Sequence, residues 1–185
     1  MEKSYLFLAD GFEEIEALAV VDILRRGGVD LIMVSITDNK HVKGAHNIEV
    51  IADCILSDIL NLNAECLILP GGLPGAANLA ECTELIEMLQ KQYNNNKYIA
   101  SICAAPALVL TKLKVKQKVA MTCYPGFEGK YTPNFEYSEA ECEITDKIIT
   151  AKGPGYANQF AFAVLEKLTS PEIAQQVANG MLICT

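Results

Sequence analysis

Histidine is nearly absent from this chain, which has only His41 and His46 among its 185 residues and no tryptophan. So few imidazoles exclude most histidine-rich metal sites, and we expect no bound metal. The cysteines lack any C-x-x-C spacing, and their number, seven, is odd. A disulfide framework or a zinc finger is therefore excluded, and free thiols in a reducing cytosol are expected. Any thiol chemistry must work with little imidazole available.

Positive charge is also in short supply, with 15 basic against 23 acidic side chains and a formal net charge of -8. Such a chain repels phosphate backbones, so nucleic acid is not an expected partner. Long apolar runs are missing as well. No stretch approaches the roughly 20 residues of a membrane span, and the run at residues 5–9 is too short for the core of a signal peptide. We expect a cytoplasmic protein with no membrane partner.

What the chain has is enough apolar residues, 51%, to bury a sizeable core. Its length fits a single domain over residues 1–185. Apolar runs that read as buried strands alternate with helical patterns, which is typical of βαβ units. The fold class expected is α/β, a three-layer sandwich with a mostly parallel central sheet. Strands are predicted at residues 4–9, 29–36, 47–51, 64–69, 97–102, 118–122, 141–145 and 147–150. Helices are predicted after residue 11 to Arg26, at 84–93, 104–114, after 155 to Leu168, and at 171–179, with helical or turn character at 54–60.

Ligands of open parallel sheets bind beyond the carboxyl ends of the strands. Four strand-to-helix turns therefore become candidate site segments, at residues 10–16, 70–75, 102–106 and 153–156. In the third, Cys103 follows an apolar strand and precedes Ala104, Ala105 and Pro106. Small neighbours allow the sharp turn that a nucleophile needs, and a helix amino terminus there would lower the pKa of the thiol. The alternative, an inert buried cysteine, has about equal weight at this point.

The other turns supply possible partners for this thiol. Gly71 and Gly72 could expose backbone N–H groups to an anion or a developing oxyanion. Glu16 heads an apolar stripe of helical spacing, so its carboxyl should be buried and its pKa raised. Glu13 and Glu14 are interpreted as solvated helix-terminal acids, and both histidines as solvated loop residues. Structural roles are expected for the remaining cysteines: Cys54, Cys66, Cys82, Cys123, Cys142 and Cys184.

Four ordered motifs carry a family resemblance: LADGFEEIEA at residues 8–17, LPGGLPGAANL at 69–79, SICAAPALVL at 101–110 and KGPGYANQFAFAVLE at 152–166. Together they resemble the ThiJ/PfpI superfamily, in its DJ-one, Parkinson-disease-protein-like branch. The resemblance is nearly collinear over the whole chain. It implies a flavodoxin-like sandwich, usually a homodimer, with a reactive cysteine on a nucleophile elbow and a protonated glutamate bonded to it.

By motif, Cys103 matches the family's nucleophile and redox-sensitive cysteine, and Glu16 matches its partner glutamate. Gly72 and Ala104 match the positions whose N–H groups form the anion pocket. Arg26 matches an arginine that lies close to this pocket.

The sequence departs from the family at one important position. A histidine often precedes the proline after the next strand, but here that residue is Tyr124. This departure argues against a Cys/His dyad and therefore against a protease. His46 could approach the pocket across a dimer interface.

The resemblance implies glyoxalase III or deglycase activity, without a cofactor, on methylglyoxal, glyoxal or their early adducts with amines and thiols. Such an enzyme would be a lyase or a hydrolase, with Cys103 as nucleophile and Glu16 as proton shuttle. The alternative is a redox sensor of oxidative stress, in which Cys103 is oxidised to a sulfinate. A chaperone or binding module without turnover finds no support in the pattern of residues. Whether the chain turns over a substrate or senses oxidants stays open at this point.

Overall fold

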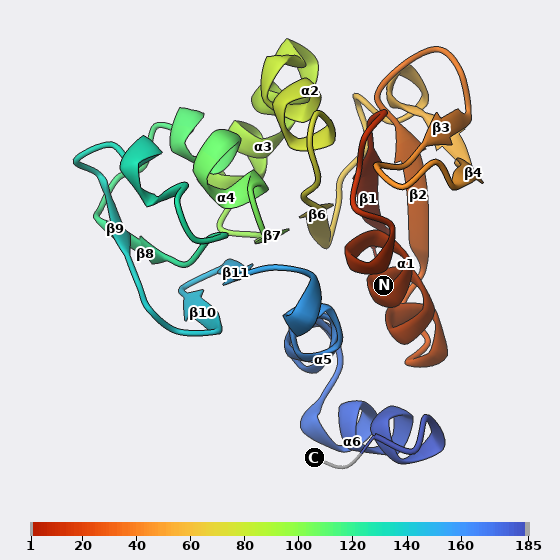
Figure 1. Ribbon diagram of the computed structural model, residues 1–185. Helices are drawn as coiled ribbons and strands as arrows, with labels where there is room; N and C mark the ends of the chain where they lie inside the picture. The colour runs from red at the N-terminus through yellow and green to blue at the C-terminus, as the bar shows by residue number, and fades with distance from the viewer. Residues whose placement is uncertain (1, 184–185) are drawn as a thin grey trace.

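A seven-stranded sheet forms the centre of the computed structural model, which describes residues 2–183 (Figure 1). The strand order is β10-β11-β7-β6-β1-β2-β5, and all neighbours are parallel except β10 and β11. The bounds are β1 Ser4–Leu8, β2 Leu31–Ser35, β5 Cys54–Ile55, β6 Cys66–Leu69, β7 Tyr98–Ile102, β10 Cys142–Thr145 and β11 Ile148–Ala151. Two small sheets pair β3 His41–Lys43 with β4 Glu49–Ile51, and β8 Val119–Met121 with β9 Phe135–Tyr137.

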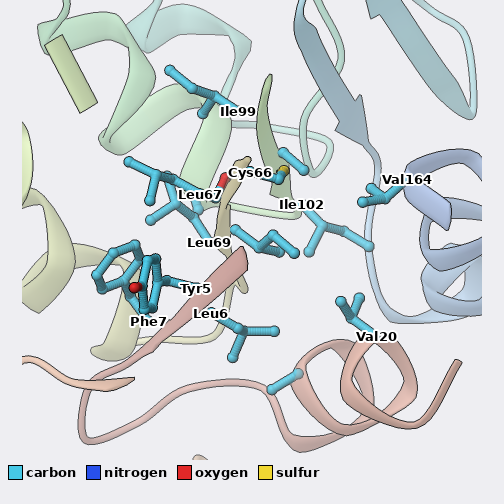
Figure 2. Close-up of a cluster of buried hydrophobic side chains, with 14 of the residues drawn as sticks. Tyr5, Leu6, Phe7, Val20, Cys66, Leu67, Leu69, Ile99, Ile102 and Val164 are labelled. Carbon is cyan, nitrogen blue, oxygen red and sulfur yellow. Dashed lines mark hydrogen bonds between the residues drawn. The ribbon is translucent and has the colours of Figure 1, made fainter. Parts of the chain in front are cut away.

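The central strands are apolar because both faces of the sheet are covered. Every residue of β1, β6 and β11 is buried. Figure 2 shows Leu6, Leu67, Ile102 and Val164 among the side chains that fill the core beside these strands. Near-continuous apolar strands of this kind distinguish parallel sheets from the alternating pattern of half-exposed ones.

Helices cover the sheet on both sides (Figure 1). On one side α1 Glu14–Arg26 packs against α5 Ala157–Leu168, and α6 Pro171–Gly180 packs against α5. On the other side lie α2 Gly75–Glu81, α3 Thr83–Asn94 and α4 Ala105–Leu108. Short 3-10 turns complete the elements: η1 Leu56–Asp58, η2 Leu110–Lys112, η3 Glu128–Lys130 and η4 Pro154–Tyr156. The predicted three-layer α/β sandwich with a mostly parallel sheet is confirmed. None of the described helices is both long and apolar enough to cross a membrane.

The sequence-based elements differ from the structure mainly in five places. The helix predicted at 104–114 is only one α-turn followed by a 3-10 turn. The Thr111 hydroxyl there donates a hydrogen bond to the Ala107 carbonyl at 2.6 Å. Side-chain competition of this kind weakens a helix. Residues 54–55 form an edge strand beside β2, rather than the helix or turn predicted there. The prediction also lacked α2 and the short strands β3 and β9.

The parallel strands bring their following turns to one edge. The N–H of Cys103, after β7, donates to the Ala151 carbonyl at the end of β11 at 2.9 Å. The N–H of Glu13, in the turn after β1, donates to the Gly71 carbonyl after β6 at 2.9 Å. The turns that the sequence singled out therefore meet at the carboxyl ends of β1, β6, β7 and β11.

Candidate active site

Cys103 occupies a sharp turn between β7 and α4. Its φ of 66° lies in the left-handed region, which costs a residue with a side chain about 1 to 2 kcal/mol. Hydrogen bonds on both sides hold it there: its N–H donates to Ala151, and its carbonyl accepts the Tyr124 N–H at 2.8 Å. The residue is 8% exposed. This strained, doubly anchored backbone directs the thiol away from the core strand that precedes it.

Glu16 lies in the first turn of α1 and is completely buried. Its Oε2 accepts the Gly71 N–H at 2.7 Å, and its carboxyl lies beside the Cys103 thiol, against the same glycine. Burial raises the pKa of Glu16 to about 7, although the Gly71 N–H and Cys103 act to lower it. Its other oxygen, Oε1, has no hydrogen-bond partner within residues 2–183. The expected buried carboxyl beside the thiol is present.

Gly71 leaves the space in which these two groups meet. A Cβ at this position would lie 2.5 Å from the Cys103 Cβ, 2.8 Å from the Glu16 Oε2 and 2.9 Å from the Cys103 Sγ. Gly72, with a φ of 87°, would bring a Cβ within 2.4 Å of the Glu13 nitrogen. Both positions therefore require glycine, Gly71 for space and Gly72 for its backbone as well.

The sulfur of Cys103 is subject to opposing influences. Burial and the Glu16 carboxylate raise the pKa of the Cys103 thiol to about 12, against the lowering effect of the Gly72 and Ala104 N–H groups. The prediction that a helix amino terminus lowers this pKa is therefore wrong while Glu16 is ionised. α4 is a single turn and has no long dipole that would stabilise a thiolate. When the proton lies on Glu16, the carboxylate charge is gone and an O–H can donate to sulfur. The two groups therefore titrate as a pair that shares a proton.

Glu14 and His46 form a second polar contact near this edge. The buried Glu14 carboxylate accepts the His46 N–H at 2.7 Å and contacts the His46 Nδ1 at 2.9 Å. Burial alone would raise the pKa of Glu14, but the bonds from His46 and the Ile48 N–H outweigh it and lower that pKa. The interpretation of Glu14 as a solvated acid is therefore wrong. The bond to Glu14 and the charges of Glu13 and Glu14 raise the pKa of His46.

Two other pocket candidates have different outcomes. Arg26 ends α1, ten residues beyond Glu16, and binds Asp22 at 2.6 Å on the exposed side of the helix. Because each helical residue adds about 1.5 Å, it lies roughly 15 Å along the helix from Glu16. Its expected position close to the pocket is wrong within one chain. Tyr124 does lie beside Cys103, because its N–H donates to the Cys103 carbonyl. The Tyr124 ring lies next to Gly153, where an added Cβ would be 3.0 Å from it.

The remaining thiols lack this environment. Six cysteines of the described chain are free, and Cys184 lies outside the described residues. As at Cys103, burial raises the pKa of the five other described cysteines: Cys54, Cys66, Cys82, Cys123 and Cys142. Among these six thiols, Cys103 is the one that lies beside a buried carboxyl, that of Glu16.

The sequence did not predict one group of possible metal ligands. Glu13, Glu14 and His46 bring three ligand atoms within 4.8 Å of one another. About thirty residues separate the histidine from the acids, and their approach depends on the β3–β4 hairpin, which was not predicted. The bonds between His46 and the two carboxylates account for this arrangement.

Comparison with known proteins shows the family of this chain. Residues 2–167 match the model of the DJ-1/PfpI family. The chain belongs to this family. It is 35% identical over 182 residues to "Protein DJ-1 homolog B" of Arabidopsis thaliana, covering 98% of this chain and 42% of that protein. The chain thus spans less than half of this plant relative.

Two further family members match over nearly their whole length. "Glutathione-independent glyoxalase DJR-1.2" of Caenorhabditis elegans is 35% identical over 174 residues, with 92% of this chain and 91% of that protein covered. The structure described as "Toxoplasma gondii DJ-1, oxidized" is 32% identical, with a TM-score of 0.95 and complete coverage of both chains. The fold and the family are therefore shown at both the sequence and the structural level.

Proposed function

We propose that this member of the DJ-1/PfpI family is a cofactor-independent enzyme of the glyoxalase III or deglycase type. The observation that carries the proposal is the buried Glu16 carboxyl beside the strained Cys103. A pKa near 7 lets a carboxyl both accept and return a proton at neutral pH. The Caenorhabditis elegans relative named a glyoxalase adds support from a homologue.

The reaction with methylglyoxal follows from these groups. The Cys103 sulfur adds to the aldehyde carbon as Glu16 takes the thiol proton, which gives a hemithioacetal. The Gly72 and Ala104 N–H groups, directed at the sulfur, stabilise its negative charge before attack. Glu16 then moves a proton from the former aldehyde carbon to the neighbouring carbonyl carbon through an enediol. Water hydrolyses the resulting thioester, so one methylglyoxal and one water give one lactate and the free thiol returns.

A cavity at Tyr124, the residue whose N–H donates to the Cys103 carbonyl, offers room for the substrate. It has a volume of about 430 Å³ and is lined by Tyr124, Pro125, Lys152 and residues 153–156. Tyr124 connects it to Cys103, because its N–H holds the Cys103 carbonyl. A small dicarbonyl, or an early adduct of one, is of the right size to enter here.

The test measures methylglyoxal consumption and lactate formation by the purified protein and three variants. We expect Cys103→Ser and Glu16→Gln each to lose about 100-fold or more of the rate, as is usual for a nucleophile or a general base. Cys82→Ser is the matched control and keeps full activity, because Cys82 is outside the site. Equal rates for wild type and Cys103→Ser would refute the proposal.

A redox role is a second candidate, favoured by the buried Glu16 Oε1, which has no hydrogen-bond partner within residues 2–183 although its carboxyl belongs to the thiol site. Two molecules of hydrogen peroxide convert the thiol to a sulfinic acid and release two waters. The sulfinate oxygens could then accept from a protonated Glu16 and from the Gly72 N–H. Intact-mass analysis after peroxide treatment tests this role: a selective gain of two oxygens that Cys103→Ser abolishes supports it, whereas unselective oxidation contradicts it.

We also propose that two copies associate through an apolar patch, defined as Ile15, Leu18, Ile48 and Ile51. These side chains are between 37% and 60% exposed. The Glu14 bonds to His46 and Ile48 hold the β3–β4 hairpin beside α1, so the four residues face solvent from adjacent elements. Exposed apolar residues gathered in this way mark association surfaces.

A further inference from the structure

A small lysine-lined cavity lies at the opposite edge of the sheet from Cys103. Its volume is about 260 Å³, and its walls come from the end of α3, the segment before β8, and the turn between β10 and β11. Lys97 directly precedes β7, whereas Cys103 directly follows it. The five residues of β7 separate the two sites by roughly 17 Å. This cavity therefore cannot belong to the thiol site.

Two tight turns shape the cavity. Asn96 has a φ of 54° in the turn between α3 and β7, and Asp146 has a φ of 54° in the turn between β10 and β11. The segment before β8 is fastened to α3, because the Lys116 N–H donates to the Tyr93 hydroxyl at 2.9 Å. The Lys114 N–H likewise donates to the Gln90 side chain at 2.8 Å. The walls are thus held by hydrogen bonds rather than by mobile side chains alone.

The charge of the lining is positive although the whole chain carries -8. Three lysines, Lys97, Lys116 and Lys147, line the cavity against one acid, Asp146. Lys97 is already paired with Glu2. Lys116 makes no side-chain hydrogen bond or ion pair with any residue from 2 to 183, and Lys147 contacts only the Tyr98 ring, 3.9 Å from its centroid. Two of the lining lysines therefore have no anionic partner in the described chain.

Neutral donors accompany these ammonium groups. The Asn96 side chain lines the cavity and has no hydrogen-bond partner in the described part of the chain. The Asn94 amide carbonyl accepts from Gln90, which leaves its own NH₂ free to donate. Ammonium and amide donors converging in one concave site suit a ligand with several acceptor oxygens and negative charge.

We infer that this cavity binds a phosphate group, either as free phosphate or as a compact phosphate monoester, with Lys116 and Lys147 as its main ligands. A long polyanion does not fit the surroundings, because Glu2, Glu136 and Asp146 lie among the lysines and the net charge is repulsive. A compact anion avoids this repulsion, since charges farther than about 8 Å are largely screened at physiological salt. The cavity is also smaller than the roughly 300 to 1,000 Å³ of sites for larger ligands.

The test is an NMR titration of the ¹⁵N-labelled full chain with inorganic phosphate and, separately, with glycerol 3-phosphate. Sodium chloride keeps the ionic strength constant. We expect saturable amide shifts confined to residues 94–97, 116–117 and 145–148 for at least one of these probes. Tighter binding of glycerol 3-phosphate identifies an organic phosphate as the ligand, and equal or tighter binding of inorganic phosphate identifies the free ion.

Two double variants make the test specific. Lys116→Gln with Lys147→Gln should weaken binding by about tenfold or more, as the loss of charge-assisted hydrogen bonds does. Lys112→Gln with Lys130→Gln removes the same charge outside the cavity and should leave binding unchanged. All four lysines are at least partly exposed, so an unaltered melting temperature checks that the variants fold. Cys103→Ser should also bind phosphate normally, which separates this inference from the proposed enzyme. Shifts that do not saturate below about 10 mM, or equal weakening by both double variants, would overturn it.

Discussion

Replacing Gly71 by alanine tests the geometry of the thiol site with a single methyl group. Gly71 does not have a left-handed φ, so alanine can adopt its backbone conformation. The N–H that donates to Glu16 also remains. The added methyl group would overlap with the Cys103 Cβ at 2.5 Å and with the Glu16 Oε2 at 2.8 Å. The substitution therefore separates crowding of the pair from loss of any functional group.

The size of the effect follows from these distances. Ordinary contacts of a Cβ begin near 3.4 Å, so Cys103, Glu16 or the turn at residues 70–72 must move by roughly 1 Å. Overpacking of this kind typically destabilises a protein by about 1 to 3 kcal/mol. Each kcal/mol lowers Tm by about 2 to 4 °C for a chain of this length. A displacement of about 1 Å between reacting groups can cost about 100-fold in rate.

Three measurements on Gly71→Ala are needed: the rate of methylglyoxal consumption, the rate of Cys103 alkylation at fixed pH, and Tm. We expect the first to fall by about 100-fold, the second to change, and Tm to fall by several degrees. Gly129→Ala is the matched control, because a Cβ there meets nothing within 4 Å and its φ is not left-handed. A Gly71→Ala protein with wild-type alkylation, activity and Tm would show that the Glu16–Cys103 contact at this glycine is not formed.

Three further predictions concern pH and assembly. Burial raises the pKa of Glu16 from 4.5 to about 7, so its ionisation opposes folding as pH rises through this range. The free energy of unfolding of Glu16→Gln minus that of wild type, measured by urea titration, should therefore increase by about 3 kcal/mol between about pH 4.5 and 7. A difference that does not change with pH would contradict this. For His46→Asn, the loss in Tm should be largest near about pH 5.5, where His46 is protonated and Glu14 is ionised in the folded protein. The pKa of His46 is raised and that of Glu14 is lowered, so the contact is lost only above the pKa of His46 or below the pKa of Glu14. Ile48→Asp should convert a dimer to a monomer in sedimentation velocity, whereas the exposed Ile144→Asp should not, and two monomeric variants or two dimeric ones count against the patch.

The parts of the site that sequence reasoning could find are those specified by local patterns. Glu16 was found because its neighbours at helical spacing are apolar, and a residue that heads such a stripe must face the core. Cys103 was found because an apolar strand ends there and small residues follow. The convergence of these turns follows from the parallel sheet, since the carboxyl ends of parallel strands lie at one edge.

The parts that failed have different causes, and only the burial of Glu14 depends on a contact between distant segments. A rule for acids in a first helical turn treats Glu14 as solvated, but the β3–β4 hairpin folds over it and buries the carboxylate. A motif match placed Arg26 near the pocket, although the predicted helix that ends at Arg26 already puts this residue at the opposite end from Glu16. α4 ends after one turn and continues as a 3-10 turn, where the Thr111 hydroxyl donates back to the Ala107 carbonyl, a local bond that the predicted helix did not include.

The scarcity of histidine matters at position 124, where this chain has a tyrosine next to Cys103. Its backbone N–H, not its side chain, holds the Cys103 carbonyl, so the strained turn does not require any particular side chain there. Both histidines contact carboxylates instead, His41 with Glu49 at 3.2 Å and His46 with Glu14 at 2.9 Å. No imidazole of the described chain is hydrogen-bonded to Cys103, and the proton of the thiol has one nearby acceptor, Glu16. A carboxyl with a pKa near 7 can move a proton within a carbonyl adduct, but it protonates an amine leaving group poorly compared with an imidazolium held by a dyad. The chemistry we propose is therefore addition to reactive carbonyls rather than peptide hydrolysis.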